Sequence, residues 1–205
     1  MAQTTLDQRM LGVGTALTDH TITASDVITF ADVGDSNLTK KDTVQGVLDL
    51  AGGGKIAQVV QSQTASIVTT SSSISHDNTI PQITEGAEVL TCAITPTNAS
   101  STLFIFVDLM CGTAGGNVGT VLALFKDSTA NAIEAKILDT GQNNYVHSDA
   151  KFIHKISAGS TSAQTFRARV AAAGSGTVGI NSYNASDQTL GGVMKSSILI
   201  MEVSP

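Results

Sequence analysis

The histidines are the first side chains in this sequence whose type and spacing could support chemistry. Of the four, only His147 and His154 lie close together, with Asp149 between them. A zinc or nucleophilic site needs at least a third ligand, or an acid that orients the base, and no HExxH, GxSxG or DxDxDG pattern occurs. We therefore expect no metal site, no cofactor and no catalytic residue, with His147 in a loop and His154 in a strand.

Paired carboxylates would be needed by a spike that cleaves polysaccharide, because glycoside hydrolysis uses two facing acidic groups. The acidic residues that could form such a pair are Glu85, Glu88, Asp108, Asp127, Glu134, Asp139 and Asp187. Their spacing neither supplies nor excludes a pair. A polysaccharide-cleaving spike stays open as an alternative, beside the expectation that the protein is not an enzyme.

Neither the glycine clusters nor the two cysteines predict a chemical site. Phosphate-binding glycines open a helix, whereas residues 112–119 precede an expected strand and residues 52–54 follow an expected helix. We interpret both clusters as turns. Cys92 and Cys111 lie among apolar residues without CxxC spacing, which predicts two buried free thiols.

Two aromatic residues could take part in binding a receptor. The only two tyrosines, Tyr145 and Tyr183, lie in segments rich in Asn and Ser, and the chain has no Trp. Aromatic side chains stack under flat apolar ligand faces such as those of sugar rings. Tyr145 and Tyr183 are therefore candidate contacts to a glycan or protein on a host cell, the alternative being that they cap the fold without binding anything.

Composition and charge restrict the class of protein further. Only 14% of the 205 residues are charged, the net charge is -6, and the 11 basic residues form no cluster that could bind a phosphate backbone. The N-terminus lacks the pattern of a signal peptide, and no apolar run approaches the roughly 20 residues that span a bilayer. We expect a protein made in the host cytoplasm, without nucleic-acid binding or membrane insertion.

A period of two in the apolar residues predicts an antiparallel β-sandwich of the jelly-roll kind over residues 55–205, the head domain. Turn signals rich in Gly, Asn, Ser and Pro separate most of the apolar segments. The predicted strands are Ile56–Gln61, Ser66–Thr70, Glu88–Ile94, Thr102–Leu109, Thr120–Lys126, Ala132–Leu138, Lys151–Ser157, Gln164–Ala171, Thr177–Ser182 and Val193–Val203.

Two of these strands carry apolar residues on both faces. Leu103–Val107 and Ile198–Met201 do not alternate, so both of their faces must be covered. Neighbouring subunits could supply the second cover, and loops of the same chain are the alternative. The side chains expected at a subunit interface of this kind are Phe104, Phe106, Leu199 and Met201.

Residues 1–54 predict an extended arm with one short amphipathic helix. The arm has too little apolar surface to fold alone, so it needs a partner. Thr39 is expected to cap a helix over about residues 40–51, and a helix of that length must dock its apolar stripe on something. A contact among three copies of the helix, through Val44, Val47 and Leu48, would bury this apolar stripe. The residues expected to hold the arm to other proteins are Leu6, Leu11, Val27, Ile28 and Phe30.

The segments Ile22–Asp35 and Leu38–Leu50 resemble the amino-terminal portion of small phage fibre-like virion proteins. Lys55–Gln61 and Ser196–Val203 are similar to the first and last strands of the β-rich heads of such proteins, which are expected to pair. The resemblance implies a homotrimeric structural protein of a bacteriophage particle, a short tail or head fibre or a decoration protein. It implies that residues 1–54 attach to capsid or tail subunits, with host attachment by the head as the alternative function.

Overall fold

The chain folds into two compact units, Met1–Gly52 and Gly53–Pro205. The computed structural model describes residues 25, 27–32, 38–50, 56–114, 119–138, 147–183 and 187–205. Among these residues, no helix is both long and apolar enough to cross a lipid bilayer. The candidate residues Leu6, Leu11 and Tyr145 lie outside the described residues.

The second unit, the head, is an antiparallel β-sandwich, as the sequence predicts. Each predicted strand of the head overlaps one strand of the structure. The strands are β3 (Ile56–Thr64), β4 (Val68–Thr70), β5 (Ala87–Ile94), β6 (Thr102–Ala114), β7 (Thr120–Lys126), β8 (Glu134–Leu138), β9 (His147–Ser157), β10 (Gln164–Ala172), β11 (Thr177–Ile180) and β12 (Ser196–Val203).

Some strand boundaries differ from the prediction. β6 continues through Gly112 to Ala114, so the first glycine of the cluster is part of a strand and not of a turn. Backbone from the neighbouring segment lies so close to Gly112 that a Cβ there would be 1.9 Å from the carbonyl oxygen of Ser182. His147 begins β9, so its expected place in a loop was wrong.

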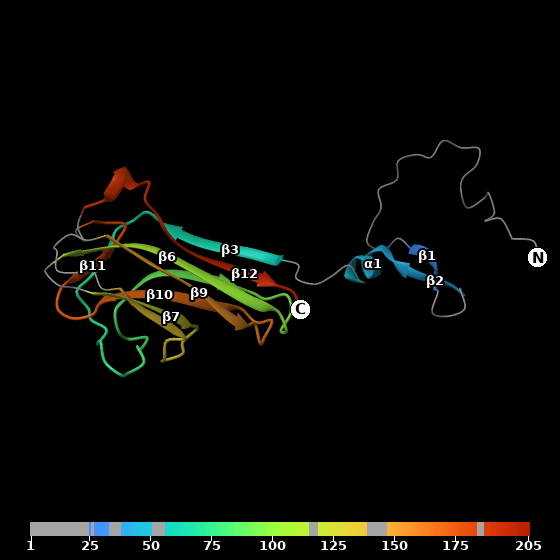
Figure 1. The fold of residues 1–205 in the computed structure, drawn as a ribbon, viewed down its shortest axis with the longest axis horizontal. Helices are drawn as coiled ribbons and strands as arrows, with labels where there is room; N and C mark the ends of the chain where they lie inside the picture. Colours follow the sequence, from blue (N-terminus) through green and yellow to red (C-terminus); the bar gives the residue numbers. More distant parts are fainter. Residues whose placement is uncertain are drawn as a thin grey trace, which may run out of the picture. The chain divides into compact units, whose positions relative to one another are not determined.

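Two sheets face each other across the core (Figure 1). The smaller has the strand order β5–β10–β7–β8. In the larger, β12 and β11 pair in succession with one edge of the long β6, and β9 pairs with the other edge. β3 pairs with β12, so the expected pairing of the first and last head strands is confirmed.

Alternate residues of the central strands fill the space between the sheets. Leu103, Ile105 and Leu109 of β6 are fully buried there, and Phe166 of β10 lies in the same cluster. The residues between them on β6 point to the opposite side of the sheet, because side chains alternate along a strand.

A smaller apolar cluster lies on the other face of the smaller sheet. Val121 and Phe125 of β7 are buried there with Ile74, which belongs to the segment between β4 and β5. Backbone hydrogen bonds fix this segment, including one from Ile74 N to the oxygen of Ala172 at 3.1 Å. The second face of β7 is therefore covered by a loop of the same chain.

Asn181 joins three strands at one end of the head. It is fully buried, and its Nδ2 donates to the carbonyl oxygens of Thr64 at 2.9 Å and Ser66 at 3.0 Å. Its Oδ1 accepts from the hydroxyl of Ser196 at 2.9 Å. Its φ of 59° is one that Asn tolerates better than most residues. The end of β3, the start of β12 and the loop after β11 are held together by this one side chain.

Replacing Asn181 by alanine is expected to lower the free energy of unfolding by about 3 kcal/mol, because buried hydrogen-bonding groups lose their partner and alanine is strained at positive φ. Glycine at the same position also loses the hydrogen bonds but not the backbone fit. It should therefore be about 1 kcal/mol less destabilising than alanine. Urea unfolding of both variants measures the difference, and equal stability of the two would contradict a strained backbone at this position.

The first unit contains a β-hairpin followed by a short helix. β1 (Val27–Asp32) pairs antiparallel with β2 (Leu38–Thr43), and α1 spans Val44–Leu50. The hydroxyl of Thr43 accepts a hydrogen bond from the backbone N–H of Gly46 at 3.0 Å, which is the geometry of a helix N-cap.

The predicted helix over residues 40–51, with Thr39 as its cap, was therefore wrong at its start. Residues 38–43 pair with β1 instead, and the helix begins only after Thr43. The polar residues of this stretch suit an exposed strand as well as a first helical turn. The partner strand, which lies several residues earlier in the chain, decides between the two.

Candidate functional site

The outer face of the larger sheet, the side away from the core, carries an apolar surface made by four strands. Register places Leu199 of β12, Phe106 of β6 and Ile153 of β9 in one row, because paired residues of antiparallel strands point to the same side. The neighbouring row contains Val59 of β3, Met201 of β12 and Phe104 of β6. We call these six side chains the outer face.

The outer face is partly open to solvent. Ile153 is 61% exposed and Val59 is 50% exposed. Phe104, Phe106, Leu199 and Met201 are half-buried. The structure thus brings together the four head residues that the sequence predicts at a subunit interface, on one surface.

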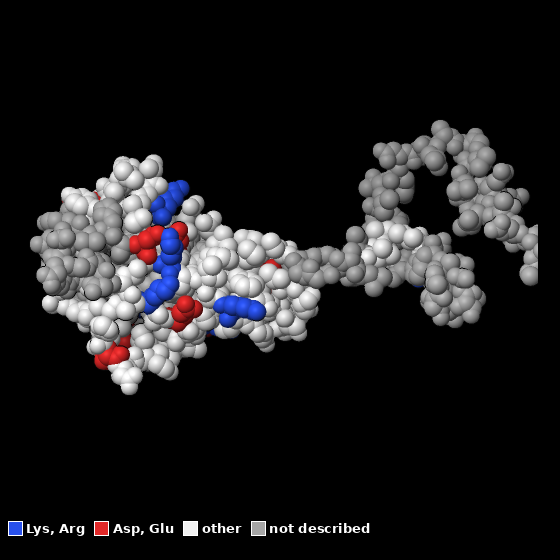
Figure 2. All heavy atoms as spheres, viewed as in Figure 1, with Lys and Arg blue, Asp and Glu red and all other residues white. Residues whose placement is uncertain are grey.

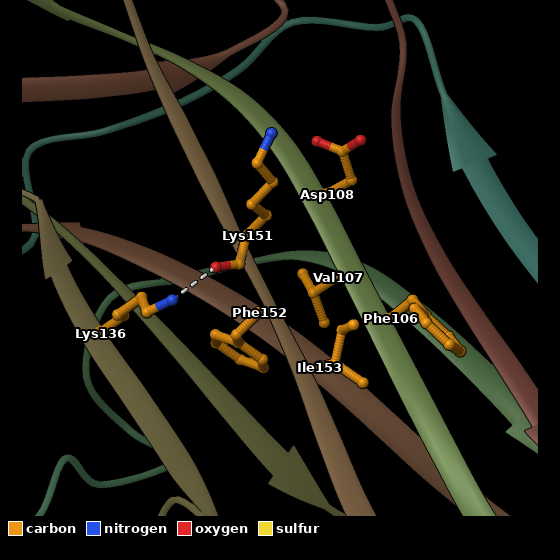
Figure 3. A pocket seen from close by; sticks show the side chains of 7 residues that line it. All are labelled: Phe106, Val107, Asp108, Lys136, Lys151, Phe152 and Ile153. Atoms are coloured by element: carbon orange, nitrogen blue, oxygen red, sulfur yellow. Dashed lines mark hydrogen bonds between the residues drawn. The ribbon is translucent and has the colours of Figure 1, made fainter.

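Two hollows lie on either side of Phe106 and Asp108. The hollow toward β9 has a volume of about 520 Å³ (Figure 3). Its lining includes Phe106, Lys151 and Ile153, and also Val107 and Phe152 of the core. The hollow toward β12 and β3 has a volume of about 370 Å³, and its lining includes Leu199 and Met201. The surface on either side of Phe106 is therefore not flat.

Charged groups of both signs border the outer face. Figure 2 shows acidic and basic side chains next to one another on the head, with large uncharged areas beside them. Lys151 forms an ion pair with Asp149. A hydrogen bond to Asp149, the charge of Asp149 and then the charge of Asp108 raise the pKa of Lys151. Lys155 lies 5.9 Å from the ring centre of Phe104.

Side chains also close the sandwich at the edge where β8 approaches β9. Lys136 Nζ donates to the carbonyl oxygen of Lys151 at 3.0 Å (Figure 3). His154 Nδ1 lies 2.6 Å from a carboxylate oxygen of Glu134. His154 is thereby engaged with an acid on the opposite sheet. Among the described residues, no three side chains of the His, Cys, Asp and Glu types are grouped as a metal site would require.

Several acidic side chains in the described part of the chain have structural partners. Glu88 contacts both Arg167, at 3.2 Å, and Arg169, at 3.6 Å. Glu202 is fully buried at the end of β12. Its carboxylate accepts hydrogen bonds from Gln58 Nε2 at 2.7 Å and from the backbone N–H of Thr97 at 2.9 Å.

The pKa of Glu202 reflects that arrangement. Burial on its own raises the pKa of a carboxyl, but the hydrogen bonds from Gln58 and Thr97 overcome it and lower the pKa to about 2. The group is therefore ionised at neutral pH and ties β3, β12 and the turn after β5 together. The two thiols are free and buried, as predicted, and burial raises the pKa of Cys111 to about 12.

The candidate attachment residues of the first unit lie on its exposed surface where their side chains are described. Val27 is 57% exposed and Ile28 is 42% exposed, and because they are neighbours on β1 they point to opposite faces of the hairpin. Val47 of α1 is 37% exposed and Val44 is half-buried. Phe30 lies in β1 and Leu48 in α1.

Sequence reasoning missed two members of the outer face, Val59 and Ile153. The signal for Ile153 was present, because Phe152 and Ile153 are apolar neighbours in a predicted strand, as in β6 and β12. The signal for Val59 was weaker, since Val59 and Val60 are flanked by glutamines. The pairing of β3 with β12 places Val59 beside Met201.

The fold and the open apolar face define an all-β sandwich protein with a second, smaller unit before it. The chain belongs to the family described as the Pgp3 C-terminal domain, which matches residues 64–205. The match begins at the last residue of β3 and leaves out the first unit. A comparison with curated proteins gave no match.

Solved structures with some similarity include viral and phage proteins. The infectious bursal disease virus VP2 subviral particle is 12% identical, with a TM-score of 0.30, over 87% of this chain and 42% of that chain. The enzymatically active domain of bacteriophage CBA120 tailspike protein 4 is 14% identical, with a TM-score of 0.26, over 62% of this chain and 19% of that chain. This chain spans less than half the length of either structure.

Proposed function

We propose that the protein is a non-enzymatic structural component of a bacteriophage particle, a homotrimeric short fibre or decoration protein. The observation that carries this proposal is the outer face of the larger sheet. Contiguous apolar surface of this kind marks interaction sites in soluble proteins. Obligate subunit interfaces resemble a domain core cut in half, and the outer face has such a composition.

Copies of the same chain are the partners that fit this face best. The face crosses four strands and holds two hollows beside Phe106, which suits packing of a neighbouring head against it. A closed ring of three heads would cover every copy of the face equally, as closed symmetry requires. The resemblance of residues 22–50 to phage fibre-like proteins favours three copies.

The first unit supports a role in attachment. A two-stranded hairpin and a seven-residue helix are marginal alone in water. Val27 and Ile28 point to opposite faces and are both exposed, so one partner surface would leave one of them uncovered. Contact with other copies on one face and with a capsid or tail protein on the other would cover both.

Changing Val27 and Ile28 together to serine is expected to remove the protein from purified virus particles without dissociating the trimer. The reason is that the change removes apolar contact area from the attachment unit and leaves the outer face of the head intact. Gradient-purified particles, quantified for this protein by mass spectrometry, give the readout.

Ile80 and Ile137, changed together to serine, form the matched control, since they are exposed at 54% and 42% but lie on the head. The control variant should be incorporated as well as the unchanged protein. Normal incorporation of the Val27/Ile28 variant would contradict the attachment role of the first unit.

Binding of a host receptor by the head is the second candidate function. Tyr183 is 40% exposed, and it follows directly the bridge that Ser182 forms with Gln188. Its exposed ring is consistent with a contact to a glycan or a protein.

A further inference from the structure

Leu190 and Val193 are more exposed than any other large apolar side chain among the described residues. They are 72% and 75% exposed and belong to the loop between β11 and β12, where η2 spans Thr189–Gly192. A hydrogen bond from Val193 N to Leu190 O, at 3.3 Å, closes one tight turn between them. The two side chains therefore form a small apolar tip.

The base of this tip is tied to the body of the head. Gln188 Nε2 donates to the carbonyl oxygen of Ala65 at 3.2 Å, and Gln188 forms a bridge with Ser182. Thr189 N donates to the carbonyl oxygen of the buried Asn181 at 3.4 Å. A tip held in this way loses little conformational entropy when it binds, and preorganisation of that kind favours affinity.

The backbone of Leu190 has a conformation that is unfavourable for leucine. Its φ of 50° and ψ of 38° lie in the left-handed region, which costs a residue such as leucine roughly 1 kcal/mol. Glycine or asparagine would adopt this conformation more easily. Because the side chain is also largely exposed, neither backbone preference nor core packing explains a leucine here. Strain of this sort is typical of functional positions.

The tip lies at the end of the head that is farthest from where the chain enters it. β3 begins at Ile56, which pairs with Val203, and it ends at Thr64, which pairs with Ser196. The loop that carries Leu190 directly precedes Ser196. Figure 1 shows this loop, in red, at the end of the head opposite the C-terminus. Within the head, the tip and the residue at which the chain enters therefore lie at opposite ends.

The chemistry of the tip selects a protein as its partner. Two aliphatic side chains give no hydrogen bonds to sugar hydroxyls and no flat ring to stack on. Insertion into a lipid surface is favoured by Trp and by basic clusters, and the chain has no Trp and a net charge of -6. A concave apolar pocket in another protein is the complementary surface.

We propose that the turn carrying Leu190 and Val193 is a recognition tip, which inserts both side chains into an apolar pocket of a protein on the host cell surface. The inference rests on the second candidate function proposed above, in which the head of the particle-bound protein binds the host. The inferred receptor is a protein, and the residues that contact it are Leu190 and Val193 in place of the tyrosines considered above.

The test measures binding of fluorescently labelled full-length protein to intact cells of the strain that harbours the gene. Leu190→Asn should weaken binding at least about 10-fold, since one buried aliphatic contact is worth 1.5 to 3 kcal/mol. Asparagine tolerates the left-handed region, so the same variant should unfold at an unchanged or higher temperature. Val193→Thr, which keeps the branched shape, should weaken binding by about 3-fold or more.

Ile80→Asn is the matched control, since Ile80 is 54% exposed elsewhere on the head, and it should bind within about twofold of the unchanged protein. Protease treatment of the cells should abolish binding, whereas periodate oxidation of their glycans should not. Equal binding by Leu190→Asn, binding that resists protease, or no binding by the unchanged protein would each overturn the proposal. Light scattering of the same samples distinguishes the failure of the trimer proposal from the failure of the tip proposal. If the protein is a monomer and its binding to cells still depends on Leu190, only the trimer proposal is contradicted.

Discussion

Replacing Phe106 by aspartate is expected to convert the proposed trimer into monomers at micromolar concentration. Phe106 lies between Leu199 and Ile153 in one row of the outer face and lines both hollows. A carboxylate at this position would have to lose its water on assembly, and the apolar contact area of the ring would be lost as well. The dissociation constant should rise on the order of 1000-fold, about 4 kcal/mol, because desolvation of a charge in an interface is strongly unfavourable.

The fold itself should tolerate this substitution. Phe106 is half-buried and points away from the core, which is filled by Leu103 and Ile105 on the opposite face of β6. The circular dichroism spectrum should therefore be unchanged. Leu199→Asp, in the same row, provides a second variant that should also dissociate. Ile137→Asp, at an exposed apolar position outside the outer face, should leave the mass unchanged. A trimer that survives both outer-face substitutions would contradict this interface.

Glu202→Gln is expected to destabilise the head by about 3 kcal/mol at neutral pH. The glutamine amide keeps the shape of the side chain but loses the charge, and it points a donor at groups that themselves donate. Those groups are Gln58 Nε2 and the backbone N–H of Thr97. Glu88→Gln is the matched control, since its ion pairs with Arg167 and Arg169 are partly exposed and should be worth less than about 1 kcal/mol.

The effect of Glu202 should depend on pH in a defined direction. The pKa is about 2 in the folded protein and ordinarily 4.5, so the ionised carboxylate stabilises the folded state above about pH 5. That stabilisation is lost as the pH falls from about 5 toward 2. The stability difference between the unchanged protein and Glu202→Gln, from urea unfolding at several pH values, should shrink over this range. A constant difference would contradict the low pKa.

The sequence predicted the head better than the first unit, for a physical reason. Alternate residues of a strand in a sandwich face the core and the solvent. In β10, for example, Phe166, Ala168 and Val170 are buried and the residues between them are not, so this strand could be placed from the pattern. A short hairpin shows no comparable alternation of buried and exposed residues. Residues 38–43 were predicted to begin a helix because the decisive information, the pairing of Leu38 with Asp32 and of Thr43 with Val27, is not local.

Apolar residues on both faces of a strand predicted that both faces are covered, but not by what. In β7 the second face is covered by the segment that contains Ile74, within the same chain. In β6 and β12 the second face contributes to the outer face, in which Ile153 and Val59 are exposed. A face covered within the chain and a face that another copy would cover leave the same pattern in the sequence. The two cases differ in the path of the chain between β4 and β5, which covers β7 and leaves the outer face open.

The recognition tip had no signal that periodicity could detect. Val193 was predicted to begin the last strand, which begins at Ser196, and Leu190 was assigned to no element. Their importance follows from their exposure and from the backbone conformation of Leu190, neither of which is encoded in the residue types alone.

The molar mass of the unmodified full-length protein in solution tests the central claim most directly. Multi-angle light scattering during size-exclusion chromatography at micromolar concentration should give three times the chain mass of 21.0 kDa. A stable species with the mass of a single chain would contradict the account, because the outer face would then be exposed permanently.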